Sequence, residues 1–229
     1  MQSHALVETI LVSTNKHKSS SSSHNLNRST NTTVTRQEAQ QRLLSLQSSA
    51  EYIPQCQYIL NNWQSQYARL VATNSPTELI TIHWNSFTIP QRTDIRNYVL
   101  GYLANKGPTL QDFVVVSLIK LVCRITKLGW FDDPVHRELA DDVTKFLQAT
   151  VDHCILGLKI LNQLVDELNI PTTGRTLTQH RKTSVSFRDV CLLRVFQLGL
   201  TTLKQLQTRT ISKYFVHAES NAIVIVFGC

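Results

Sequence analysis

The chain has 229 residues, which is enough for one or two ordinary domains. Apolar residues make up 42% and charged residues 17%, with seven glycines and six prolines, so the composition excludes a fibrous or wholly disordered protein. Lysines and arginines outnumber aspartates and glutamates by 23 to 16, and the net charge of +7 favours an acidic partner without identifying its class.

The cysteines and the first residues point to a reducing compartment. The five cysteines lie more than thirty residues apart, so they contain no CxxC pair and no cluster of metal ligands. The first 12 residues lack the basic region and cleavage site of a signal peptide, and no run approaches the roughly 18 to 20 apolar residues of a membrane span. We therefore expect no metal, no signal peptide and no membrane segment.

Two segments depart from the rest of the chain. Residues 15–34 contain five consecutive serines followed by asparagines and threonines, which predicts a disordered loop. Near the end, the apolar run AIVIVF at 222–227 has nothing after it to pair with, which is typical of an edge strand or of a misjoined end of a repeat array.

Between these segments, apolar residues recur with the period of a helix. Three capping boxes predict helix starts: Thr35 with Glu38, Thr88 with Gln91, and Thr109 with Asp112. Buried positions are expected on the apolar faces: Leu43, Val99, Leu121, Phe146, Ile155 and Leu161. Trp130 and Phe131 are expected to pack in a turn between helix pairs.

The helices alternate between a narrow and a wide apolar face, which is typical of stacked helical hairpins. Inner helices are predicted at 110–127 and 151–168, and outer helices at 90–105 and 134–148. Pro90 and Pro134 lie 44 residues apart, within the roughly 40 to 47 residues of a HEAT or armadillo unit. The pattern predicts an all-α, HEAT-type α-solenoid of about four to five antiparallel helix pairs, truncated at its C-terminal end. A compact helical bundle is the alternative.

No motif for catalysis is present. The chain has no phosphate-binding glycine loop, no HExxH and no GxSxG. His153 and Cys154 are interpreted as a surface histidine beside a core cysteine, and Asp133 as the cap before a helix. Asp141 and Asp142 are interpreted as a solvated helix face. We expect no enzyme activity, no catalytic residue and no cofactor.

Two basic clusters are candidate partner sites. The first, the α-helical stripe of Lys120, Arg124 and Lys127, has i, i+4, i+7 spacing on an otherwise apolar inner helix, so it is expected on a concave face as a docking or solubilising stripe. The second is placed on a long connection after Asn169. Its members are Arg175, His180, Arg181, Lys182 and Arg188. With Phe187 as the one nearby aromatic, a nucleic-acid partner is disfavoured relative to an acidic protein.

Four short segments of the sequence are more specific than this pattern. They occur at 91–104, at 124–132 (RITKLGWFD), at 142–148 and at 177–189. In this order they resemble the importin-β superfamily, in the branch that contains exportin-7 and related Ran-binding proteins. The resemblance covers about residues 35–207, and residues 1–14 would hold the first helix of such a domain. Residues 208–229 have no counterpart and are expected to be an atypical tail.

The resemblance implies a karyopherin: a nuclear transport receptor that binds Ran-GTP through its amino-terminal repeats and carries protein cargo past nuclear pore proteins, shuttling between nucleus and cytoplasm. Residues 15–34 would then be an insertion in the first hairpin, and the sequence Asn74-Ser75-Pro76 would interrupt a helix that restarts at a capping box of Ser75 and Glu78. The alternative function is a HEAT-repeat scaffold that ignores the nucleotide.

Overall fold

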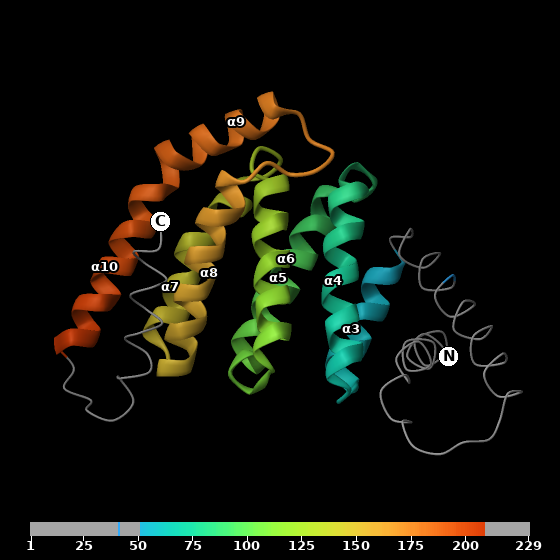
Figure 1. Ribbon diagram of the computed structural model, residues 1–229, viewed down its shortest axis with the longest axis horizontal. Helices are drawn as coiled ribbons and strands as arrows, with labels where there is room; N and C mark the ends of the chain where they lie inside the picture. Colours follow the sequence, from blue (N-terminus) through green and yellow to red (C-terminus); the bar gives the residue numbers. More distant parts are fainter. Residues whose placement is uncertain (1–40, 42–50, 209–229) are drawn as a thin grey trace, which may run out of the picture. The chain divides into compact units, whose positions relative to one another are not determined.

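The computed structural model describes residue 41 and residues 51–208, and the regular elements in these ranges are all helical (Figure 1). Contacts divide the chain into two compact units that meet in sequence between Ser86 and Phe87. The predicted helix at 1–14, the loop at 15–34, the Thr35 cap, Leu43 and the tail after residue 208 lie outside the described residues.

The first unit contains a helical hairpin. Helix α3 (Tyr52–Asn62) is joined by a short link to α4 (Gln66–Ile82), and the two helices pack against each other. Ser65 caps α4 through its side chain, which accepts a hydrogen bond from the backbone N–H of Ala68. A 3₁₀ turn follows at Trp84–Ser86.

The predicted break at Pro76 was wrong, because α4 continues through this proline. Proline removes one backbone donor and crowds the carbonyl four residues earlier, so it usually ends a helix. Here Pro76 is buried, and threonine hydroxyls on the same helix donate to backbone carbonyls of the preceding turn, Thr77 to Thr73 and Thr81 to Thr77. Ser75 is also buried within the helix, so it does not cap a second one.

The second unit begins with the hairpin of α5 (Ile89–Lys106) and α6 (Asp112–Leu128). The capping box of Thr88 and Gln91 is confirmed. The one predicted at Thr109 was wrong: Thr109 ends a 3₁₀ turn at Gly107–Thr109, where its hydroxyl donates to the carbonyl of Lys106, and Gln111 occupies the cap position of α6.

The next hairpin joins α7 (Leu139–Gln148) to α8 (Val151–Asn169). Asp133 caps the segment before α7, as expected, although this first turn, Pro134–Glu138, is a 3₁₀ helix. Both α5 and α7 pack on the helix that follows them, and α6 packs on α8. The inner and outer helices are therefore arranged as predicted, and the all-α, HEAT-type fold is confirmed for the described residues.

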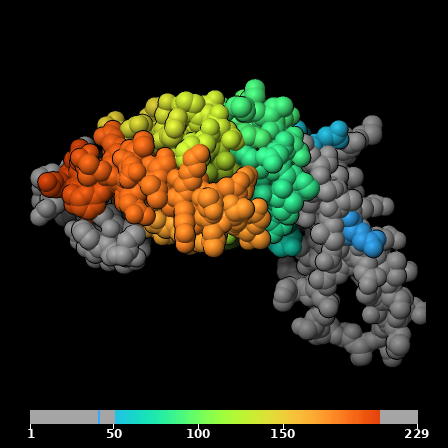
Figure 2. All heavy atoms as spheres, turned by 90° about the horizontal axis from the view of Figure 1, so that it is seen from above, coloured from blue at the N-terminus to red at the C-terminus, as the bar shows by residue number. Residues whose placement is uncertain are grey.

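The last described element is one bent run in place of a hairpin. Helix α9 (Leu177–Phe187) passes through a π-helical turn (Arg188–Leu192) into α10 (Leu193–Thr208). Figure 2 shows α9 in orange on the surface of the second unit, continuing into the red α10. Leu203 and Leu206 of α10 pack against Cys154 and Leu158 of α8, which anchors the end of the run.

The predicted core positions in the described residues are largely correct. Val99, Leu121, Phe146 and Leu161 are buried, whereas Ile155 is half-buried. Trp130 is buried as expected, but its neighbour Phe131 is 47% exposed. Gly157 lets α8 approach α7 closely, because a Cβ atom there would lie 2.8 Å from Leu147.

The turn after α6 encloses a histidine. The ring of His136 is fully buried against Gly129, where an added Cβ would overlap the ring. Burial, and after it the Arg96 guanidinium, lowers the pKa of His136 to about 4 against the opposing charges of Asp132 and Asp133. His136 is therefore neutral in the folded chain at neutral pH.

This buried ring predicts acid sensitivity. Its folded pKa lies below the ordinary value of about 6.5, so the unfolded chain binds the proton first and stability falls as the pH drops from about 6.5 towards 4. Between pH 7.5 and 4.5 we expect His136 to account for about 2 to 3 kcal/mol of lost unfolding free energy. Urea unfolding at several pH values should give a shallower pH dependence for His136→Gln than for the parent; equal slopes would contradict this assignment.

Candidate functional site

The three residues of the stripe on α6 lie in different environments. Lys120 is exposed, Arg124 is half-buried, and the Lys127 side chain is buried near the C-terminal end of α8. Arg124 donates two hydrogen bonds to the Glu167 carboxylate on α8. Its Nε lies 2.5 Å from Oε1, and its Nη2 lies 3.4 Å from Oε2. The stripe is thus divided between one exposed cation and two that contact the neighbouring helix.

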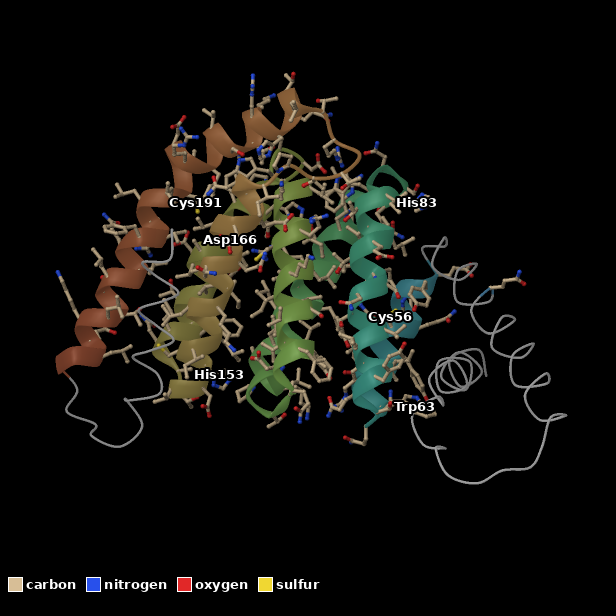
Figure 3. The ribbon with its side chains drawn as sticks, in the orientation of Figure 1. Cys56, Trp63, His83, His153, Asp166 and Cys191 are labelled. Carbon is tan, nitrogen blue, oxygen red and sulfur yellow. The ribbon has the colours of Figure 1, made fainter. Side chains whose placement is uncertain are left out.

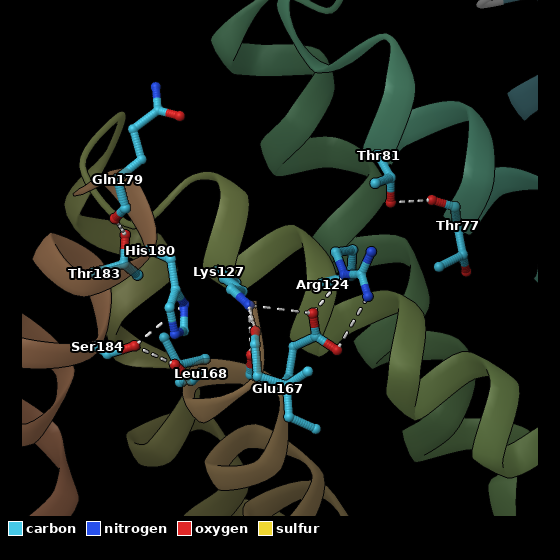
Figure 4. A network of polar contacts seen from close by, with 11 residues as sticks. Thr77, Thr81, Arg124, Lys127, Glu167, Leu168, Gln179, His180, Thr183 and Ser184 are labelled. Carbon is cyan, nitrogen blue, oxygen red and sulfur yellow. Dashed lines mark hydrogen bonds and ion pairs between the residues drawn. The ribbon is translucent and has the colours of Figure 1, made fainter. Parts of the chain in front are cut away.

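Lys127 donates hydrogen bonds to backbone carbonyl oxygens at the end of α8 (Figure 4). Its Nζ donates to the carbonyl of Glu167 at 2.7 Å and to that of Ile170, and lies 4.0 Å from the Glu167 carboxylate. From α9, the Ser184 hydroxyl donates to the carbonyl of Leu168 at 2.5 Å. The last carbonyls of a helix have no partner within the helix and carry partial negative charge, so these donors stabilise the end of α8.

Lys127 remains a cation at neutral pH in spite of its burial. Burial lowers the pKa of its ammonium to about 8, a net value that includes the opposing effect of the Glu167 carboxylate and a smaller lowering by the Arg124 charge. A protonated Lys127 that donates to two carbonyls holds α6 against α8. Of the three stripe residues, Lys120 is the one whose side chain is exposed to a partner.

The second basic cluster lies largely on a helix, so its predicted placement on a long loop was wrong. The connection after α8 is short, because α9 begins at Leu177 behind a capping box of Thr176 and Gln179. His180, Arg181 and Lys182 are in α9, Arg188 opens the π turn, and Arg175 precedes the helix. The Thr176-x-x-Gln179 pattern is the sequence signal that identifies this start.

A cavity of about 250 Å³ lies between the end of α6, the 170–176 connection and α9. Its lining includes these polar and aromatic side chains: Lys127, Phe131, Asp132, Arg175, Gln179, His180 and Lys182. The Lys182 ammonium lies 4.7 Å from the centre of the Phe131 ring, a cation–π contact at the edge of the cavity. Burial, then the charges of Lys127 and Arg181, lowers the pKa of His180 below its ordinary value.

Ion pairs between neighbouring repeats were missed by the sequence interpretation. Asp142, expected on a solvated face, accepts from the buried Arg96 of α5 at 2.7 Å, and Asp141 pairs with Arg194 of α10 at 3.1 Å. Arg92 and Asp132 pair at 2.5 Å. Three of the pairs are separated by about the length of one repeat: 40 residues for Arg92 and Asp132, 43 for Arg124 and Glu167, and 46 for Arg96 and Asp142, whereas Asp141 and Arg194 are 53 residues apart.

The interpretation of His153 and Cys154 agrees with the structure. Cys154 is buried, whereas His153 lies in the first turn of α8 (Figure 3). The ring nitrogens of His153 contact the Thr150 hydroxyl at 2.7 Å and the Ala104 carbonyl at 2.8 Å. None of the four cysteines in the described residues is in a disulfide, and burial raises the pKa of the Cys191 thiol to about 11. Burial also raises the pKa of the Cys56 and Cys123 thiols, so these three thiols are protonated at neutral pH.

Two further kinds of feature, a metal-binding group and a membrane-spanning helix, are absent from the described residues. Within residue 41 and residues 51–208, no three histidine, cysteine, aspartate or glutamate side chains are grouped so as to hold a metal ion. None of the helices in those same ranges has the length and hydropathy required to cross a membrane.

Comparison with known proteins identifies the family. Residues 39–105 match the model of the importin-beta N-terminal domain. The chain carries an importin-β N-terminal domain. It is 43% identical over 180 residues to exportin-7-A of Xenopus laevis, in an alignment that covers 77% of this chain and 16% of the relative.

Two further relatives agree with this identification. Ran-binding protein 17 of Mus musculus is 41% identical over 179 residues, covering 76% of this chain and 16% of the relative. Ran-binding protein 16 of Drosophila melanogaster is 37% identical over 196 residues, covering 82% and 17%. The chain thus aligns with about one sixth of each relative, and these relatives are named as an exportin and as Ran-binding proteins.

Proposed function

We propose that this chain is the Ran-GTP-binding amino-terminal region of an exportin-like nuclear transport receptor. The observation that carries the proposal is the match of residues 39–105 to the importin-beta N-terminal domain, in a chain whose relatives are named exportin-7 and Ran-binding protein. The stacked helix pairs and the net charge of +7 suit an extended contact with an acidic protein face.

The proposal extends to what the full-length receptor would do. Residues 35–207 would form the repeat region that binds Ran-GTP, with residues 1–14 as its first helix, 15–34 as an inserted loop and 208–229 as an atypical tail. Protein cargo would leave the nucleus bound to the longer array, which passes nuclear pore proteins and shuttles between nucleus and cytoplasm. No enzymatic step or cofactor belongs to this function.

The contact surface proposed for Ran-GTP is the basic stripe of α6, with the second basic cluster as a further surface. Lys120 is exposed on α6, and Arg181, Lys182 and Arg188 are exposed on the α9 run. Arg124 and Lys127 belong to the stripe by sequence, but both also bind Glu167. Reversing the charge of Arg124 or Lys127 would therefore change the stability of the chain as well as its binding. A charge reversal at the exposed Lys120 would change the binding alone.

Retention on immobilised Ran tests the proposal directly. We expect the full chain to bind Ran loaded with a non-hydrolysable GTP analogue much more strongly than Ran loaded with GDP. Equal retention in both nucleotide states would support the alternative, a HEAT-repeat scaffold, and the lack of retention in both states would remove Ran as a partner.

A charge reversal tests the stripe. Lys120→Glu should slow association with Ran-GTP about 3- to 10-fold at low salt, with the difference shrinking at high salt, because an exposed charge acts mainly through long-range attraction. Lys106→Glu is a matched control, since Lys106 is an exposed lysine at the end of α5. If surface plasmon resonance gave the same association rates for the two variants, the stripe would be a solubilising face.

A further inference from the structure

The cavity between α6 and α9 has an excess of positive charge in its lining. Lys127, Arg175 and Lys182 contribute cationic groups to it, and His180 stands among them. The carboxylate in its lining, Asp132, is already paired with Arg92 at 2.5 Å. The Glu167 carboxylate near Lys127 is shared with Arg124, so two cations face one anion there. Positive charge therefore remains uncompensated around this cavity.

The size and shape of the cavity limit its occupant. At about 250 Å³ it falls below the roughly 300 to 1,000 Å³ of pockets that enclose small-molecule ligands, and it suits a single side chain. With Phe131 as the aromatic side chain in its lining, it offers no stacking platform for the bases of a nucleic acid. A short anionic group on a flexible chain fits these limits.

The chemistry of the lining favours a carboxylate over a phosphate group. Phosphate sites commonly use free backbone N–H groups at the start of a helix. At the start of α9 the N–H of Gln179 donates to the Thr176 hydroxyl at 3.2 Å, and the Gln179 side chain accepts from the N–H of Thr176 at 3.1 Å. Leu177 and Thr178, whose N–H groups belong to the same turn, do not line the cavity, so the donors that face it are side chains. The half-buried Arg175 can bind a carboxylate through two parallel hydrogen bonds.

We propose that this cavity is a docking site for a glutamate or aspartate side chain of an acidic protein segment, held by Arg175 and Lys182. Lys182 is positioned at the rim by its contact with the Phe131 ring, and Arg175 by its place immediately before α9. This site shares Lys127 with the stripe and Arg175, His180 and Lys182 with the second basic cluster, but it does not include Lys120. The proposal itself does not depend on Ran or on a nucleotide.

A titration of the full chain with a hexaglutamate peptide at low salt tests the site. The ring signals of His180, assigned by their loss in His180→Gln, should shift during the titration. The bound carboxylate should also raise the pKa of His180, because it offsets the cations that lower this pKa in the free chain. Hexaglutamate that leaves the His180 signals unchanged would overturn the proposal.

Matched variants locate the contact. Arg175→Gln and Lys182→Gln should each weaken hexaglutamate binding about 10-fold or more, because each removes a charged donor from the carboxylate. Arg188→Gln removes the same charge from an exposed arginine that does not line the cavity, and should leave binding unchanged. Equal weakening by Arg175→Gln and Arg188→Gln would reveal diffuse attraction to the whole helix and contradict a built site.

A second ligand distinguishes the two kinds of anion. Inorganic phosphate and acetyl-capped glutamate peptides can each be titrated against bound hexaglutamate under the same conditions. Phosphate should displace hexaglutamate only at a much higher concentration than the glutamate peptides. Tighter binding of phosphate than of hexaglutamate would overturn the assignment to carboxylates. Circular dichroism of the Lys182→Gln chain should match that of the parent, because this side chain is exposed.

Discussion

Replacing Trp130 by alanine is expected to lower the unfolding free energy of the chain by about 3 to 5 kcal/mol, the range for deleting a buried aromatic side chain. Trp130 is 1% exposed and follows directly after α6. Its indole N–H donates to the Ser186 hydroxyl at 3.0 Å, and its ring meets the buried ring of Phe187 edge-on at 5.8 Å. The truncation would open a cavity where the end of α6 holds the end of α9.

Chemical unfolding and amide exchange measure this effect. Because α9 loses its aromatic contact, its amides should exchange faster than those of α6 and α8 in Trp130→Ala. Trp130→Phe keeps part of the buried area and should cost less. Phe131→Ala is the matched control, since this adjacent aromatic is 47% exposed and should lose about 1 kcal/mol or less. Similar losses for Trp130→Ala and Phe131→Ala would contradict the packing role.

The helical fold could be predicted because its local signals agree with one another. The capping box at Thr88 and the wide apolar faces of α6 and α8 can be recognised in the sequence, and the structure contains both. The prediction of a cap at Thr109 was wrong because Gly107–Thr109 form a 3₁₀ turn, in which the Thr109 hydroxyl donates to the carbonyl of Lys106. The prediction of a helix break at Pro76 was wrong because proline's tendency to end a helix is local. It takes no account of the packing of this buried turn within the first unit.

The candidate site was less predictable, because it depends on contacts between repeats. The spacing of Lys120, Arg124 and Lys127 places them along α6 but does not say which of them meets the next helix. Glu167, which binds two of them, is 43 residues beyond Arg124. A search for opposite charges separated by one repeat length would have found this pair and the pair of Arg96 and Asp142, 46 residues apart.

The pairing of Glu167 predicts the second large effect on stability. Its carboxylate is 7% exposed and serves both Arg124 and Lys127 between α6 and α8. Removing one member of a buried ion pair leaves the other charges without compensation, which typically costs about 3 to 5 kcal/mol. Glu167→Ala should therefore lower the unfolding free energy by about that amount, and Glu167→Gln, which keeps the volume and an acceptor, should lower it by less.

A double-mutant cycle separates the ion pair from packing. If Glu167 stabilises the fold chiefly by compensating Arg124, then Arg124→Met should cost much less in the Glu167→Leu background than in the parent, giving a coupling of about 1 to 3 kcal/mol in urea unfolding. Glu138→Gln, at an exposed carboxylate before α7, is the control and should change stability by about 0.5 kcal/mol or less. The coupling should persist at high salt, because a buried pair is screened far less than surface charges. Additive losses at both salt concentrations would mean that Arg124 and Glu167 act through their packing alone, leaving Arg124 available to a partner protein.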